Sequence, residues 1–236
     1  MKNFRRLFFV ITICFALILS ACVGTQKAGK NDSLVIVKTS LSYVSQSDIE
    51  RVKKEGEKAL NTVCPVLGIE KNKRIKIQIV EGGICNAYGG VVSLPIRFVT
   101  SKRAAIVHEV THIIAKHENN RFFSEGLAVY FQERFGEDHG FPNFSGLPLD
   151  DLVRNNKDQL MTITKLMNDN EIFRQVGTER RRIAYIQAGS FINFLVVTYG
   201  EQKLADLHNS WTLNYKKIYG KKVKELEAEW KNFVFM

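Results

Sequence analysis

The chain has 236 residues, of which 34 are Lys or Arg and 24 are Asp or Glu, so its formal net charge is +10. Hydrophobic residues make up 45% of it, and no internal repeat or low-complexity segment is visible, which excludes repeat and low-complexity architectures. The basic residues are dispersed apart from Arg180-Arg181-Arg182 and two lysine pairs, so we predict solvated basic faces and no nucleic-acid partner.

The N-terminal segment predicts export. Three basic residues precede an apolar run over residues 7–19, which is too short to span a membrane as a stable helix. The run ends in LSAC at residues 19–22, a pattern that resembles the lipobox of bacterial lipoproteins. We therefore expect residues 1–21 to be a lipoprotein signal peptide and Cys22 to carry the lipid. The alternative is an ordinary signal peptide that leaves Cys22 as a free or paired thiol.

The next segment predicts a tether to a membrane. Residues 22–33 are small and polar and indicate a flexible linker, after which residues 34–236 are long enough for one domain with a single core. Removal of residues 1–21 leaves a net charge of about +7, which suits a protein beside an anionic lipid surface. We expect a bacterial cell-envelope protein that its lipid anchors to the membrane, facing the periplasm or the exterior.

The first part of the domain predicts a small sheet. The stretch SLVIVKT at residues 33–39 is typical of a strand, and residues 48–63 have apolar side chains at helical spacing. Residues 74–80 alternate between polar residues and isoleucine, as a half-buried strand does. Glycine pairs follow, and residues 91–98 are expected to form another strand.

Two cysteines remain after export. Cys64 and Cys85 lie in the domain, and two thiols outside the cytoplasm can pair. The sequence leaves open a Cys64–Cys85 disulfide or two small, separately buried side chains. Neither cysteine has the spacing of a zinc ligand.

The stretch HEVTH is the motif that carries chemistry. We predict a helix over residues 102–116 with Ser101 as its N-cap. On such a helix His108 and His112 share one face because they are four residues apart, so both imidazoles can bind one ion. Glu109 lies on the turn beside that ion and can reach a metal-bound water.

A third ligand follows thirteen positions after His112. Glu125 belongs to SEGLAVYF, which predicts a second apolar helix. A catalytic zinc takes three protein ligands and leaves a fourth position for water, so His108, His112 and Glu125 are the expected ligands of a zinc cofactor. Gly126 is expected to allow close packing beside the ion.

The remainder of the chain predicts helices. A loop is expected after Arg134 through Pro142 and Pro148. Helices are expected over residues 160–168, 179–199, 202–214 and 223–233. The fold class is therefore α+β, with a small N-terminal mixed sheet, an active-site helix and a mostly helical C-terminal half.

Together these stretches resemble a known family. HEVTHIIAKH followed by FFSEGLAVYF resembles the gluzincin branch of the HExxH metallopeptidases, in particular the bacterial peptidase MA-like domains. AYIQAGSFINFLVVTYG is similar to a later segment of that group, and the resemblance extends over about residues 75–232. It implies a zincin-like fold with Glu125 as third zinc ligand. In such folds an edge strand pairs with an extended substrate, and Ala87–Leu94 is the expected edge strand.

These features predict zinc-dependent hydrolysis of peptide bonds in a peptide or protein substrate. Glu109 is the expected general base on the zinc-bound water, and Tyr185 is the first candidate donor to the oxyanion, unless it is only a packing aromatic. His208 is the second candidate donor, while His117 and His139 are expected to be bystanders. The main alternative is a non-catalytic zincin-fold lipoprotein that binds metal or peptide. A structural lipoprotein with an accidental motif is a third.

Overall fold

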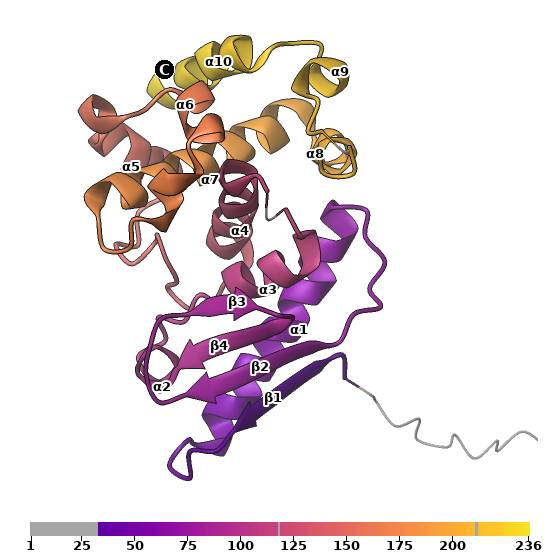
Figure 1. Ribbon diagram of the computed structural model, residues 1–236, viewed down its shortest axis with the longest axis vertical. Coiled ribbons are helices and arrows are strands. Elements are labelled where there is room, and N and C mark those ends of the chain that lie inside the picture. Colours follow the sequence, from indigo (N-terminus) through magenta and orange to yellow (C-terminus); the bar gives the residue numbers. More distant parts are fainter. Residues whose placement is uncertain (1–32, 118, 211) are drawn as a thin grey trace, which may run out of the picture. The chain divides into compact units, whose positions relative to one another are not determined.

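The computed structural model describes residues 33–117, 119–210 and 212–236 (Figure 1). Within it, Ser33–Met236 forms one compact unit. The expected signal peptide (1–21), the lipidated Cys22 and all of the expected tether except Ser33 lie outside the described residues. In the part of the chain that the structure describes, no helix combines the length and apolarity needed to cross a membrane.

A four-stranded mixed sheet forms the N-terminal part of this unit (Figure 1). Its strands run in the order β1-β2-β4-β3, with parallel pairing between the first three and antiparallel pairing between β4 and β3. Their bounds are Val35–Thr39 for β1, Ile75–Val80 for β2, Asn86–Tyr88 for β3 and Val91–Pro95 for β4. The expected α+β class with a small N-terminal mixed sheet is confirmed.

Helix α1 (Gln46–Val66) connects the parallel strands β1 and β2 and covers one face of the sheet (Figure 1). In β2 the residues Ile75, Ile77 and Ile79 are buried, while the two between them are exposed, so only one face contacts the core. Gly56 lets α1 approach closely, because a Cβ there would lie 3.0 Å from side-chain atoms of both Ile77 and Val35.

The edge of the sheet differs from the prediction of one strand over Ala87–Leu94. Gly89 and Gly90 adopt φ values of 57° and 79°, which makes a tight turn and divides this stretch into the hairpin β3–β4. The edge strand on this side is therefore β3, with β1 at the opposite edge, and β4 lies inside the sheet. The strand expected over residues 91–98 ends at Pro95, because proline has no N–H to continue the ladder, and helix α2 (Ile96–Thr100) follows.

The motif helix is shorter than predicted. Ser101 is the C-cap of α2 and not the N-cap of the motif helix. Lys102 has a φ of 54°, a left-handed conformation that ends α2, and helix α3 begins only at Ile106 and runs to Ala115. The HEVTH stretch lies wholly within α3.

The rest of the unit is helical (Figure 1). Its α-helices are α4 (Arg121–Phe135), α5 (Leu149–Asn155), α6 (Ile163–Asn168), α7 (Glu179–Tyr199), α8 (Glu201–His208), α9 (Tyr215–Tyr219) and α10 (Val223–Phe235). Two 3₁₀ turns, η1 (Lys157–Gln159) and η2 (Asn170–Arg174), lie between them. The helix expected over residues 179–199 is confirmed at those bounds, whereas the one expected over 202–214 ends at His208. α2, α5 and α9 were not predicted.

Helices α4 and α7 cross closely at two glycines. A Cβ on Gly126 would lie 2.9 Å from the carbonyl oxygen of Ala188, and one on Gly189 would lie 2.3 Å from Cγ1 of Val129. Only glycine fits at either position without a shift of the neighbouring atoms, so Gly126 does allow close packing, against α7; the ion beside it stays a prediction.

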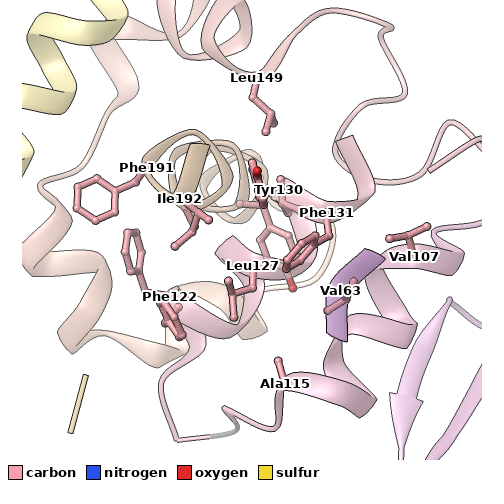
Figure 2. Packing of buried hydrophobic residues seen from close by; sticks show 14 of the residues in the cluster. Val63, Val107, Ala115, Phe122, Leu127, Tyr130, Phe131, Leu149, Phe191 and Ile192 are labelled. Carbon is pink, nitrogen blue, oxygen red and sulfur yellow. The ribbon is translucent and has the colours of Figure 1, made fainter. Parts of the chain in front are cut away.

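One hydrophobic core joins the sheet side to the helical side. It includes Val63 of α1, Val107 of α3, Phe131 of α4 and Ile192 of α7, which all lie in the same cluster of buried residues (Figure 2). Phe122 lies beside Phe191, with 5.7 Å between the ring centroids. This core fixes α3 between the sheet and α4, and that placement builds the site described next.

Candidate metal centre

The two histidines of the motif occupy one face of α3, and α4 supplies the acidic residue opposite them. α3 ends at Ala115, and the left-handed conformation of its C-cap residue Lys116 (φ 52°) turns the chain back. α4 begins after Asn120, whose side chain accepts a hydrogen bond from the N–H of Phe123. This turn brings Glu125, in the second turn of α4, against α3.

Three ligand atoms converge between these helices. The Nε2 atoms of His108 and His112 are 3.1 Å apart, and Oε2 of Glu125 lies 3.3 Å from the first and 3.2 Å from the second. Ligands at about 2.0–2.1 Å from a tetrahedral ion are separated by about 3.3 Å, so the triangle has the dimensions of a zinc site. Among the residues that the structure describes, this is the cluster of His, Cys, Asp or Glu residues that could hold a metal.

The carboxylate of Glu125 is buried between the two imidazoles. Oε2 of Glu125 is buried and near both imidazoles, yet it forms no hydrogen bond of acceptable geometry in the described part of the chain. Burial of a carboxylate is costly, and either protonated imidazoles or a cation at the centre of the triangle would compensate it. The residues present therefore fit a zinc ion.

The surrounding groups hold the ligands in place. Nδ1 of His112 is 3.1 Å from Oγ of Ser124, which orients the ring for coordination through Nε2. The buried side chain of Gln132 accepts from the N–H of His108 at 3.0 Å and donates to the carbonyl of Asp138 at 2.8 Å. Gln132 thereby fastens the start of α3 to α4 and to the following loop.

The carboxyl group of Glu125 and the imidazole of His112 shift each other's pKa values. Burial alone would raise the pKa of Glu125, but His112 and His108 outweigh it and hold that pKa well below its ordinary value. Burial tends to lower the pKa of His112, and Glu125 reverses this effect and raises it. The carboxylate is thus ionised, as a metal ligand must be.

Glu109 is buried beside the cluster and lines the adjacent cleft. Burial raises the pKa of its carboxyl, and the nearby His108 and His112 offset part of that increase. A carboxyl group of raised basicity that faces a cleft next to a metal site has the properties of a general base.

Tyr185 lies on α7 at the other side of the cluster. Its ring stacks on that of His108, with 6.1 Å between centroids and 9° between planes. Its hydroxyl accepts a hydrogen bond of 2.8 Å from Nη2 of Arg181 and lies next to the Glu125 carboxylate. Burial and Glu125 raise the pKa of this hydroxyl, which therefore stays protonated and able to donate.

The remaining histidines lie away from the cluster. Nε2 of His117 is 2.7 Å from Nδ1 of His208, so these two side chains pair with each other. Burial lowers the pKa of His208 to about 4, which makes it neutral near pH 7. His208 does not line the cleft, so it is not placed to donate to an oxyanion there, although the sequence made it the second candidate donor. His139 is exposed on the loop after α4.

Both cysteines of the domain are free thiols, so the disulfide left open by the sequence is not formed. Cys64 lies near the end of α1, where Lys71 and Lys73 are its charged neighbours, whereas Cys85 faces Glu109 and Arg97. The two thiols have different surroundings at different places in the fold. Cys85 lines the cleft.

A cleft of about 1090 Å³ opens over the cluster. The loop before β3, the strand β3 itself, α3 and residues of η2 and α7 line it. Sequence reasoning missed Arg181 and Gln132 as members of the site. The only signal for Arg181 was its position four residues before Tyr185, and Gln132 gave none, because its partners are distant in sequence.

No protein-family model matches this chain, and neither the curated proteins nor the solved structures contain a match.

Proposed function

We propose that the protein is a zinc-dependent peptide hydrolase with a zincin-like fold, in which His108, His112 and Glu125 hold the ion. The observation that carries this proposal is the triangle of two imidazole nitrogens and one carboxylate oxygen with edges of 3.1–3.3 Å. The buried, raised-pKa carboxyl of Glu109 beside the triangle favours a catalytic role over metal storage, because a storage site needs no base.

Each residue around the cleft then has a role. When bound, zinc lowers the pKa of a coordinated water to about 7 and polarises the scissile carbonyl. Glu109 takes the proton from the attacking water and passes it to the leaving amine. Tyr185 donates a hydrogen bond to the oxygen on which negative charge develops, and Arg181 orients its hydroxyl.

The edge strand supports a peptide as substrate. β3 pairs with β4 on one side only and lines the cleft, so its other edge can pair with an extended peptide backbone. We further propose, from residues 1–22 alone, that the protein is a lipoprotein of the bacterial cell envelope, anchored through Cys22.

The test compares wild type with Glu109→Gln. The variant is expected to bind zinc at the wild-type ratio and to cleave a mixed peptide substrate at least about 10³-fold more slowly, since its amide cannot accept a proton. Glu50→Gln, an exposed change on α1, is the matched control and should cleave normally. If zinc-loaded wild type cleaves no peptide, catalysis is refuted and the alternative of a non-catalytic binding lipoprotein is favoured. If Glu109→Gln cleaves as fast as wild type, Glu109 is refuted as the general base.

A further inference from the structure

The charge of the cleft wall is strongly one-sided. Among the described residues that line the cleft, the acidic ones are Glu109 and Glu125, and both belong to the candidate metal centre. The basic ones are Lys73, Arg74, Arg103, Lys116, Arg121, Arg174 and Arg181. A divalent ion on the triad would balance the two carboxylates, so the cations of the wall would set the sign of the potential in the cleft.

Four of these cations, Lys73, Lys116, Arg103 and Arg181, form no ion pair with a carboxylate of the described residues, and two of the four are arginines. Arg103 is exposed in the segment between α2 and α3, and its guanidinium lies over the ring of Phe144 at 4.4 Å. Arg181 donates to the carbonyl of Phe173 and to the hydroxyl of Tyr185, both neutral acceptors. Arg121 and Arg174, by contrast, form ion pairs with acidic residues.

A row of aromatic rings connects the two arginines. Phe144 contacts Phe141 with 6.0 Å between centroids, and Phe141 contacts Tyr185 with 4.8 Å. Arg103 lies over the first ring and Arg181 lies 4.6 Å over the last. A guanidinium stacked on a ring is held in place, and its N–H groups can still bind a carboxylate. Arg103 forms no side-chain hydrogen bond with the described residues, whereas Arg181 uses its Nε and Nη2 for Phe173 and Tyr185 and keeps Nη1 available.

We propose that the cleft selects acidic peptide segments, with Asp or Glu side chains beside the scissile bond bound by Arg103 and Arg181. This inference rests on the proposed function for the position of the scissile bond. β3 and the aromatic row line the same cleft, so an extended peptide paired with β3 would share that cleft with the two guanidiniums, neither of which pairs with a carboxylate. The favoured substrate is thus a peptide with carboxylates, and a basic peptide is repelled.

The test uses three labelled decapeptides that differ only in having Glu, Gln or Lys on both sides of the central bond. Binding is measured by fluorescence anisotropy on zinc-loaded, full-length Glu109→Gln, and cleavage is measured on wild type. The Glu peptide is expected to bind at least about tenfold more tightly than the Gln peptide, and the Lys peptide more weakly than both. At about 0.5 M NaCl these ratios should fall several-fold, because salt screens exposed charges.

Charge reversal at Arg103 tests whether this residue causes the preference for the Glu peptide. Arg103→Glu in the Glu109→Gln background is expected to lower the Glu-to-Gln preference at least about fivefold. Arg103→Gln, which adds no charge, should lower it less and serves if the reversal does not fold. Lys224→Glu is the matched control, because it makes the same charge change on exposed α10 outside the cleft and should leave the preference intact.

The outcomes separate this inference from the proposed function. Acidic preference in binding without any cleavage by wild type would keep the inference and refute catalysis. Cleavage with equal use of the three peptides would keep catalysis and overturn the inference. A preference for the Glu peptide that persists in Arg103→Glu would also overturn the inference. Displacement of the Glu peptide by a single-stranded oligonucleotide as effectively as by unlabelled Glu peptide would overturn it too, because the cleft would then bind any polyanion.

Discussion

Arg181 and Tyr185 stand one helical turn apart on α7, and the guanidinium donates a hydrogen bond of 2.8 Å to the phenol oxygen. Because the oxygen accepts from Arg181, its own proton points elsewhere, and the neighbouring group on the metal side is Glu125. The pair thus holds a hydroxyl beside the cluster from α7, a helix that supplies none of its three residues.

Replacement of this hydroxyl tests whether it takes part in turnover. Tyr185→Phe keeps the ring stacked on His108 and removes only the donor, so turnover of peptide is expected to fall by about a hundredfold. Zinc content, measured by elemental analysis, and the thermal midpoint should stay near those of wild type. Tyr43→Phe, which changes an exposed tyrosine, is the control. Normal turnover by Tyr185→Phe would reduce Tyr185 to a packing residue.

Removal of one imidazole tests the metal centre. His112→Ala is expected to lose stoichiometric zinc, because two ligands remain of three, whereas His139→Ala changes an exposed histidine and should keep it. In wild type, zinc at about 100 times its dissociation constant should stabilise the fold by about 2.7 kcal/mol, and a chelator should reverse this. Calorimetry with and without zinc gives the comparison. Full zinc retention by His112→Ala would contradict the assigned ligand set.

The contact between α4 and α7 predicts an overpacking effect. Gly189→Ala would place a Cβ 2.3 Å from Cγ1 of Val129, a β-branched side chain with little freedom to move. The expected loss is about 1–3 kcal/mol in the free energy of unfolding, although alanine is the better helix former. Denaturant titration of Gly189→Ala, Val129→Ala and the double variant should show that the second change relieves the first. Simple additivity would locate the strain elsewhere.

A buried carboxyl outside the cluster, on α1, predicts how stability depends on pH. Burial, followed by the nearby Asp138, raises the pKa of Glu55 from 4.5 to about 7. The folded state therefore holds this proton more tightly than the unfolded state. Its contribution to stability is complete below about pH 4.5 and is lost as pH rises toward 7, up to about 3 kcal/mol.

Glu55→Gln removes this titration. The variant should be more stable than wild type at pH 8 and similar to it at pH 4, when thermal midpoints are measured across this range. Its amide can still accept from the N–H groups of Glu137 and Asp138, as Oε1 of Glu55 does at 2.8 and 3.3 Å. Glu50→Gln on the same helix is the control and should follow the wild-type profile. An unchanged profile for Glu55→Gln would place the titrating group elsewhere.

The sequence predicted correctly the bounds of α7, a helix that has a recognisable cap residue at each end. α7 begins after Thr178, whose hydroxyl accepts from the N–H of Arg181, and ends at Gly200, whose φ is 88°. Both are recognisable cap residues, so its bounds were correct. The helical spacing of HEVTH likewise placed His108 and His112 on one face.

The misplaced elements depend on contacts that sequence patterns do not contain. The left-handed conformation of Lys102 ends α2, yet lysine gives no sign of it. The ion pair between Arg51 and Asp138, with an Nη1–Oδ1 distance of 2.6 Å, joins positions 87 residues apart. In the site, Glu125 was predictable from its motif, but the hydrogen bonds of Gln132 became visible only when α3 and α4 were placed together.

The short edge strand has a consequence for self-association. β3 has three residues, and a glycine turn follows it immediately. Long exposed edges invite the same edge of another copy to pair with them, which is a common start of aggregation. A strand of three residues offers few backbone hydrogen bonds for pairing with a second copy of the protein. A peptide that also occupies the cleft would gain side-chain contacts in addition to these hydrogen bonds. At the β3 edge, the proposed binding of a peptide therefore does not require a strand long enough to pair with a second copy.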